Sequence, residues 1–452
     1  MDKRGSLHRV YLVIDLKSFY ASVECVERGL DPMKAKLVVA DPERTDKTIC
    51  LAVSPAMKAL GVKNRCRVFE IPKNIDYIMA PPRMQKYIDY AAEIYGVYLK
   101  YIAPEDIYVY SIDEAFLDVT NYLSLYHKTP KEMAVFLMEQ VKEKVGVRAT
   151  CGIGTNMYLA KIALDITAKH AKDFIGELNE ESFKEILWGH EPLSDFWRIG
   201  PGIEAHLFRL GIRNMGQLAA ADENLLYREF GKDAELLIDH AYGREPVTIA
   251  DVKAYKPKSN SITQGQVLMS DYSYKDAELI VREMTDQLCL DLVKRNMVTG
   301  SITLMVGYSR TSGPKPETNS NAPWASYMGA MSGGTVSIDI DTSSDDVWIP
   351  KVVELYRQIA DPAYKIRRVF INANNIHEDD GQMQLSLFSE SPESLEKSKR
   401  LQETMLKVKS RYGKNAILKG MDFEEKAMTR TRNKQIGGHK SGEETDGPNG
   451  RF

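Results

Sequence analysis

Ser111-Ile-Asp-Glu-Ala-Phe-Leu-Asp118 holds an acidic pair, Asp113 and Glu114, within a short run of apolar residues. Far upstream, the apolar run Val10-Tyr-Leu-Val-Ile ends at a single acid, Asp15. Both stretches have the apolar, β-branched and aromatic character of strands. If the two strands are neighbours, three carboxylates converge, and these cannot all ionise without a counter-charge. The pattern therefore predicts a site for hard divalent cations, since Mg²⁺ binds a few carboxylates together with substrate phosphate oxygens.

Each acidic element has an ordinary structural alternative. An Asp after an apolar strand often caps the next helix. An Asp-Glu pair inside a strand usually places one side chain on each face, where water solvates it. The residues that surround the acids favour a catalytic role over these alternatives.

The stretch from Asp15 to Glu24, Asp-Leu-Lys-Ser-Phe-Tyr-Ala-Ser-Val-Glu, together with Ser111–Phe116, resembles the two catalytic motifs of Y-family (translesion) DNA polymerases. The resemblance extends over residues 8–390 and is closest to UmuC-type bacterial proteins. It implies a low-fidelity, template-directed DNA polymerase that binds primer-template DNA and deoxynucleoside triphosphates. It also implies nucleotidyl transfer to a primer 3′-hydroxyl with two Mg²⁺ ions, which stabilise the attacking and leaving oxygens.

The bulk properties fit a multidomain protein. A chain of 452 residues, 43% hydrophobic, is too long for a single core. The net charge is only −3, but residues 401–440 contain ten lysines and arginines against four acids. That segment is either a solvated tail or a surface for phosphates. Five cysteines without a C-x-x-C pattern, and no long apolar stretch or signal peptide, predict a cytoplasmic protein with no membrane association.

The expected fold class is α+β, with strands and helices alternating before a helical region and a second small domain. That domain has the order β-α-β-β-α-β: strand 262–268, helix 274–294, strands 301–307 and 335–341, helix 346–359 and strand 366–372. By resemblance we assign a palm with short fingers (1–165, fingers about 26–78), a helical thumb (166–250), a polar, extended linker (251–260), a little finger (261–375) and a tail (376–452). The tail is expected to be flexible apart from a possible helix at 394–411.

The same resemblance assigns roles at the catalytic site. Asp15, Asp113 and Glu114 would hold the two metal ions, with the backbone carbonyl of Leu16 as a further ligand. Tyr20, which follows Phe19, would be a steric gate, because a ring packed under the sugar leaves no room for a 2′-hydroxyl. The alternative is that Tyr20 is an ordinary core residue of the first helix.

Cationic residues would bind the triphosphate. Lys58 and Lys169 match phosphate-binding positions of the family, and Lys172 competes with Lys169 for the second role. The sequence departs from the family at Ser54-Pro55, where many members have an aromatic-acidic pair, so a phosphate contact at Pro55 is not assumed. A solvated surface position remains the alternative for either lysine.

Two regions are candidates for DNA contact. Residues 198–212 resemble a helix-hairpin-helix, in which Gly200 and Gly202 let backbone amides approach a phosphate without reading sequence. Arg367 and Arg368, near Lys365 in the last strand of the little finger, are candidates for the template backbone. The alternative for the two arginines is a solvated strand face.

Gln384-Leu-Ser-Leu-Phe388 matches the pentapeptide by which bacterial DNA polymerases bind the sliding clamp. Gln384, Leu385, Leu387 and Phe388 would make the contacts, because apolar residues in a polar, flexible stretch need a partner's pocket. The alternative is a short strand packed on the little finger. UmuC-type relatives also work with an accessory dimer of the UmuD type, which the residues neither require nor exclude.

Two other function classes are compatible with parts of the sequence. A non-catalytic, clamp-tethered DNA-damage accessory protein would lack one of the three acids, and all three are present. A nucleotidyl cyclase uses a similar palm, but it would need neither the helix-hairpin-helix nor the clamp peptide. Both features therefore favour the polymerase.

Overall fold

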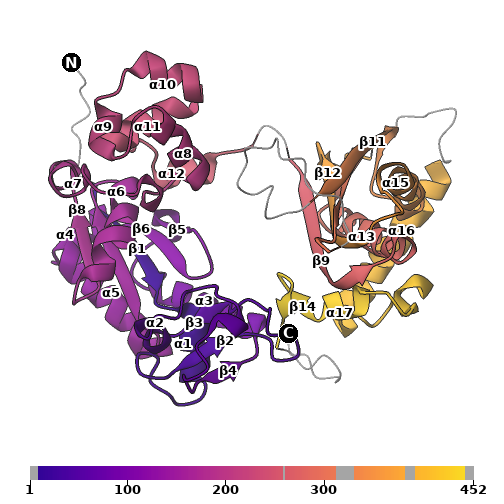
Figure 1. Ribbon diagram of the computed structural model, residues 1–452, viewed down its shortest axis with the longest axis horizontal. Helices are drawn as coiled ribbons and strands as arrows, with labels where there is room; N and C mark the ends of the chain where they lie inside the picture. Colours follow the sequence, from indigo (N-terminus) through magenta and orange to yellow (C-terminus); the bar gives the residue numbers. More distant parts are fainter. Residues whose placement is uncertain (1–8, 258–259, 312–329, 382–391, 443–452) are drawn as a thin grey trace. The chain divides into compact units, whose positions relative to one another are not determined.

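The computed structural model describes residues 9–257, 260–311, 330–381 and 392–442, which fall into two units (Figure 1). Unit 1 contains Met1–Tyr255 and His439–Gly442, and unit 2 contains Lys256–Gly438. The division lies inside the predicted linker 251–260. The first part of that linker is helical, because it overlaps the end of α12 (Ile249–Ala254). Thr248 is the N-cap of this helix, and its hydroxyl accepts the amide hydrogen of Asp251. In the described part of the chain, no helix has the length and apolar character needed to cross a membrane.

The central sheet of unit 1 has five strands in the order β5-β6-β1-β7-β8. Strand β1 is antiparallel to both of its neighbours, β6 and β7, and all but one of its residues are buried. A central strand covered on both faces is expected to be a continuous apolar run, as residues 10–14 are. The strands are β1 (Tyr11–Leu16), β5 (Ile107–Val109), β6 (Glu114–Asp118), β7 (Ala149–Gly154) and β8 (Ile175–Leu178).

Helix α6 (Met157–Ile162) lies unusually close to this sheet because β7 carries two glycines. A Cβ atom on Gly152 would lie 2.0 Å from the carbonyl oxygen of Ala160, and one on Gly154 would lie 2.2 Å from the Ala160 nitrogen. Only glycine permits such an approach between a strand and a helix backbone. The close packing brings the side chains of α6 over β1 and β6.

The remaining part of unit 1 before residue 150 contains a second, smaller sheet and several helices. Its three-stranded sheet has the order β3-β2-β4 and its own apolar core. The elements are α1 (Phe19–Val26), β2 (Leu37–Val39), β3 (Ala52–Val53), α2 (Pro55–Ala59), η1 (Val68–Glu70), β4 (Ile78–Ala80), α3 (Met84–Tyr98), η2 (Pro104–Asp106), α4 (Thr120–Leu125) and α5 (Pro130–Val145).

The region after α6 is helical, as the sequence predicts, with one exception. Strand β8 (Ile175–Leu178) adds an edge to the central sheet and was not predicted, since four residues including a glycine give little strand signal. Most of these helices share one apolar core, whereas α12 packs against β1 through Ile249. They are η3 (Ala163–Thr167), η4 (Ala168–His170), α7 (Glu180–Leu187), η5 (Leu193–Asp195), α8 (Pro201–Arg209), α9 (Met215–Ala219), α10 (Glu223–Phe230), α11 (Asp233–Ala241) and α12.

Unit 2 has the predicted β-α-β-β-α-β order, and its sheet runs β11-β10-β12-β9 with all neighbours antiparallel. Helices α13 and α15 pack on it and against each other around a shared apolar core (Figure 1). Most of the predicted 311–334 loop lies outside the described residues. The elements are β9 (Ile262–Tyr272), α13 (Tyr274–Lys294), β10 (Met297–Tyr308), β11 (Met331–Thr342), α15 (Asp345–Ile359), β12 (Ile366–Asn374) and β13 (His377–Glu378).

The predicted flexible tail needs a correction. Residues 392–438 are folded in unit 2, where Lys419 pairs with Asp345 and, at 2.6 Å, with Asp286 of α13. The buried carboxylate of Glu283 accepts the amides of residues 428 and 429, each at 2.9 Å. The possible helix at 394–411 is confirmed as α16. The folded residues after it were read as flexible tail, because polar anchors of this kind give no apolar pattern. The elements are α16 (Pro392–Tyr412), η6 (Gly420–Phe423), α17 (Thr429–Asn433), β14 (Gln435–Ile436) and β15 (His439–Lys440).

Candidate active site

Asp15 and Glu114 lie directly opposite each other on neighbouring strands. They are paired in the antiparallel register of β1 and β6. Successive side chains of a strand alternate between faces. Tyr11, Val13 and Phe116 pack on the face that carries α6, so Asp15 and Glu114 share that face. The two carboxylates therefore converge, and the alternative of one solvated acid on each face does not hold for Glu114.

Asp113 immediately precedes β6 and is fixed by local hydrogen bonds. Its backbone carbonyl accepts the amide of Leu16 at 2.9 Å. Its carboxylate accepts the hydroxyl of Ser111 at 2.6 Å. These bonds hold the end of β1 against the start of β6, so the third predicted acid and the Leu16 backbone lie beside the first two.

The acids affect one another electrostatically. Burial, followed by the negative charges of Asp113 and Glu114, raises the pKa of Asp15 to about 7. Burial also raises the pKa of Glu114, although Lys161 opposes that effect. A buried acid that resists ionisation because of its neighbours requires additional positive charge before all three can be anionic.

Part of that charge comes from Lys161, which the sequence reasoning missed. Its ammonium lies 2.8 Å from Oε1 of Glu114 and 3.1 Å from Oδ2 of Asp165, and its side chain is 9% exposed. Burial lowers the pKa of Lys161, but the two carboxylates outweigh burial and raise it overall. The spacing of Lys161 and Asp165, four residues apart in a helical stretch, was the signal that could have identified this pair.

A divalent cation fits the chemistry of the donor set, although the acids are not arranged around one point. Among the described residues, no group of three acidic, histidine or cysteine side chains is placed to hold a metal ion. Glu114 faces Lys161 instead. Within the same residues, Oε1 of Glu114 is buried without a well-aligned hydrogen bond. Carboxylate oxygens of this kind are the ligands that Mg²⁺ prefers.

Of the two predicted phosphate lysines, Lys58 interacts with the charge of Asp15, and Lys169 lies beside Asp165. Burial lowers the pKa of Lys58, Asp15 opposes that effect, and Lys169 adds to it. Lys169 is mostly exposed and lies 3.6 Å from Asp165. Lys17 is a third cation that the sequence reasoning missed; burial and the charge of Lys58 lower its pKa.

The unusual Ser54-Pro55 pair has a structural role in presenting Lys58. Ser54 is fully buried and is the N-cap of α2; its hydroxyl accepts the amide of Met57 and donates to the carbonyl of Ala35 at 2.7 Å. Pro55 occupies the first helical position, where a missing amide hydrogen costs nothing. The pair therefore starts the short helix that carries Lys58.

Tyr20 is half-buried and stacks on another tyrosine. The ring centroids of Tyr20 and Tyr87 are 4.4 Å apart with an interplanar angle of 14°. Tyr87 donates its hydroxyl to the buried carboxylate of Glu24 at 2.9 Å, and Arg83 grips the same carboxylate with two hydrogen bonds. Burial, then the charge of Asp113, raises the pKa of Tyr20. Phe19, by contrast, is 3% exposed and belongs to the core.

The predicted helix-hairpin-helix places its glycines at the start of α8. Gly200 is the N-cap and Gly202 lies in the first turn. A Cβ atom on either would meet no other atom within 4 Å, so packing does not require glycine at these two positions. A turn with Gly211 at φ +81° then leads to α9. The open first turn of α8 is consistent with backbone approach to a phosphate.

The other predicted contact residues lie in or next to unit 2. Arg367 is at a β-bulge of β12, and its guanidinium is 3.5 Å from Asp271. Arg368 is partly exposed on the same strand and lies beside Gly307 of β10. Gln384, Leu385, Leu387 and Phe388 lie outside the described residues, so the clamp motif is not tested.

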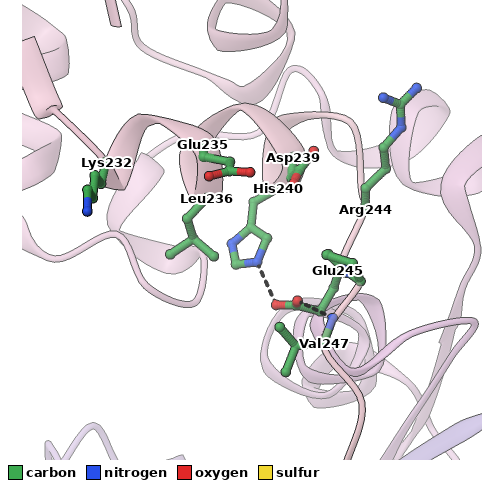
Figure 2. Close-up of a pocket in the computed structure, with 9 residues that line it drawn as sticks. Lys232, Glu235, Leu236, Asp239, His240, Arg244, Glu245 and Val247 are labelled. Carbon is green, nitrogen blue, oxygen red and sulfur yellow. Dashed lines mark hydrogen bonds and ion pairs between the residues drawn. The ribbon is translucent and has the colours of Figure 1, made fainter. Parts of the chain in front are cut away.

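A pocket of about 270 Å³ lies between α11 and the chain that follows it (Figure 2). There His240 is 3.1 Å from the carboxylate of Glu245, and the ring of His240 stacks on Tyr158 with the ring centroids 3.8 Å apart. The carboxylate of Glu245 also accepts the amide hydrogen of Val247. Burial acts to raise the pKa of Glu245, but these bonds and nearby positive charges lower it overall. His240 and Glu245 thus satisfy each other, and this pair is assigned no catalytic role.

Comparison with known proteins covers nearly the whole chain. The model of the impB/mucB/samB family matches residues 14–165, and that of its C-terminal domain matches residues 259–387. The chain is 31% identical over 439 residues to UvrX of Bacillus subtilis (strain 168), whose name refers to repair of UV damage, covering 95% of this chain and 97% of that protein. It is 29% identical over 436 residues to "DNA polymerase IV 2" of the same organism, with 95% and 98% covered.

A solved structure confirms the predicted fold class. A Y-family DNA polymerase chimera superposes with a TM-score of 0.62 and 20% identity, covering 82% of this chain and 99% of that one.

Proposed function

The chain belongs to the impB/mucB/samB family of Y-family DNA polymerases, and from that premise we propose how its own residues carry out translesion synthesis. It is a DNA-directed DNA polymerase of the translesion type. The observation that carries the proposal is the convergence of Asp15 and Glu114 in register, with Asp113 beside them and Lys161 paired with Glu114. The proposed reaction is attack of a primer 3′-hydroxyl on the α-phosphate of a nucleotide, directed by the template.

Asp15, Asp113 and Glu114 would hold two Mg²⁺ ions, with the carbonyl of Leu16 as a further ligand. Bound there, the ions supply positive charge to the attacking and leaving oxygens of the phosphoryl group. The chain's contribution is to keep the acids close enough that ionisation of all three depends on this charge. Lys161 would hold Glu114 in place when the site is empty and release it as the cations bind.

Lys58 and Lys169 would bind the triphosphate. Lys58 interacts with Asp15, and the burial that lowers the pKa of Lys58 also strengthens its interaction with an anion. Positioning of this kind is the main catalytic task in phosphoryl transfer, because the protein supplies no nucleophile. Lys172 is exposed and remains the competing assignment for Lys169.

Tyr20 would select deoxyribose. Its ring is fixed by the stack on Tyr87, and it lies near Asp113, at the end of the acid cluster. A fixed ring under the sugar excludes a 2′-hydroxyl by steric overlap. Phe19 would contribute through the core rather than by direct contact, since it is buried.

DNA would be held at two places that do not read its sequence. The first turn of α8, with Gly200 and Gly202, would bind a backbone phosphate through amide groups. Arg367 and Arg368 of unit 2 would contact the template backbone. A sliding clamp would bind Gln384, Leu385, Leu387 and Phe388, and an accessory dimer of the UmuD type stays a prediction from the resemblance.

Primer extension by the purified full chain tests the proposal. In the presence of Mg²⁺, and with each of the four template bases tested separately, we expect insertion of the complementary deoxynucleotide. We also expect extension past an abasic position in the template. Lys58→Met and Lys169→Met should raise the KM for the nucleotide, while Lys172→Met serves as a matched control. Extension that ignores the template base, or none by folded protein, would overturn the proposal. A KM effect confined to Lys172→Met would reassign the second phosphate contact.

A further inference from the structure

The segment His439–Gly442 near the C-terminus belongs to unit 1, although the 183 residues before it, Lys256–Gly438, form unit 2. Two glycines at φ +59° and +81°, Gly437 and Gly438, directly precede it and let the backbone turn sharply. The chain therefore leaves unit 1 after Tyr255 and returns to it at His439. A return of this kind over four residues requires specific contacts to hold it.

Lys440 makes the charged contacts of the segment. Its ammonium lies 2.6 Å from Glu43 and 3.3 Å from Asp41 in the loop between β2 and β3. Asp41 is largely buried, with a side chain 9% exposed, and also lies 3.4 Å from Arg44. The interaction of one ammonium with two carboxylates, one of them largely buried, contributes more stability than an isolated ion pair on the surface.

Ser441 caps a helix of unit 1. Its carbonyl accepts the amide of Gln85 at 2.9 Å, in the first turn of α3. The first amides of a helix have no partner inside the helix. The residue before α3, Arg83, provides no side-chain cap. The carbonyl of Ser441 therefore takes the place of a capping side chain, and Ser441 itself is buried.

Gly442 fits against Arg83 in a way that other residues cannot. Its φ is +83°, and a Cβ atom there would lie 2.6 Å from Cβ of Arg83. Both the backbone conformation and the close approach require glycine. The three contacts are of different kinds, and two of them, at Lys440 and Gly442, depend on the identity of the residue.

We propose that His439–Gly442 is a docking strap, and that Asp41, Glu43 and the first turn of α3 form its receptor on unit 1. The receptor fits a peptide with a lysine, a free backbone carbonyl and a glycine in succession. When docked, the strap caps α3 and packs on Arg83. Arg83 donates two hydrogen bonds to the carboxylate of Glu24, which also accepts the hydroxyl of Tyr87. The strap thus supports the N-terminal end of the helix behind Tyr20. This inference rests on contacts within unit 1 and does not depend on the polymerase assignment.

Hydrogen exchange of the full chain tests the strap, because the Gln85 amide reports its docking. Lys440→Glu and Gly442→Val remove different contacts, and a chain that ends at Gly438 removes the whole strap. Each should speed exchange at Gln85 by at least about tenfold, since only docked strap protects that amide. Lys407→Glu makes the same charge change at an exposed residue of α16 and should leave Gln85 unchanged.

Exchange in the interior of α3, around Ile94, should stay slow in all variants and shows that unit 1 remains folded. Unchanged exchange at Gln85 in the chain that ends at Gly438 would overturn the proposal. So would equal acceleration by Lys407→Glu, because the effect would then come from charge in general. Loss of α3 protection at Ile94 together with Gln85 would mean that the segment supports the whole fold rather than docking on it.

Discussion

Replacing Asp15 with asparagine should make unit 1 more stable at high pH. The pKa of Asp15 is raised in the folded protein from 3.8 to about 7, chiefly by burial and then by Asp113 and Glu114. The folded state therefore holds this proton more tightly than the unfolded state. The contribution of protonated Asp15 to the free energy of unfolding is fully present below the pKa that Asp15 has in the unfolded chain. It is lost as the pH rises through the pKa that Asp15 has in the folded protein.

The size of the effect follows from the two pKa values. Each pKa unit is worth about 1.4 kcal/mol, so ionised Asp15 costs about 4 kcal/mol of folding free energy. About 3 kcal/mol of this cost develops between pH 5 and pH 8. Asp15→Asn does not titrate, so its stability advantage over the wild type should grow by that amount across the same range. Titrating groups that do not interact with Asp15 are common to both proteins and cancel.

Urea unfolding, followed by hydrogen exchange of peptides from β1 and β7, measures this difference in unit 1. Asp76→Asn changes an exposed acid of the same unit and is the matched control. Adding Mg²⁺ at pH 8 should stabilise the wild type more than Asp15→Asn, because the cation relieves the unmet charge. A stability difference that stays constant from pH 5 to pH 8 would refute the reasoning about the acid cluster.

Three further outcomes are expected. Tyr20→Ala should raise the ratio of ribo- to deoxyribonucleotide insertion efficiency by at least about tenfold; Tyr87→Leu should raise it less, and Tyr87→Phe, which keeps the ring, should leave it near the wild-type value. Lys161→Met removes the cation beside Glu114 and should shift the pH of half-maximal extension upward; an unchanged pH profile would mean that Lys161 does not tune the acids. Replacing both Leu387 and Phe388 with alanine should weaken clamp binding at least about tenfold, about 1.4 kcal/mol, because each buried side chain contributes roughly 1.5–3 kcal/mol. Clamp-free extension by that double variant should be unaffected, and unaltered clamp binding would show that the pentapeptide does not recruit the clamp.

Much of the fold could be predicted because its elements carry strong local patterns. The apolar run before Asp15 and the periodic helix 130–145 gave their elements within a residue or two. The β-α-β-β-α-β order of unit 2 was also readable. Strand β8 and the folded segment 413–438 were not, because a short edge strand and polar anchors such as Lys419 leave no apolar period.

The acid cluster was predictable for a different reason. Every second residue of a strand lies on the same face of the sheet. Two acids at the ends of paired strands can therefore lie on one face, as Asp15 of β1 and Glu114 of β6 do. Lys161 was missed because a lysine in an apolar helix gives no sign of the carboxylate opposite. The role of Ser54 as a helix cap, and of Tyr87 as the partner of Tyr20, likewise depends on contacts between distant segments.

The most direct test of the central claim is primer extension and primer-template binding measured on the same Asp113→Ala protein. The account predicts that extension falls by at least about 100-fold, because the acid cluster can no longer hold its cations. Affinity for primer-template should stay close to that of the wild type, since Asp113 is assigned no DNA contact, and Asp76→Ala should resemble the wild type in both measurements. Extension by Asp113→Ala at a rate near that of the wild type would contradict the assignment of these carboxylates as the catalytic centre.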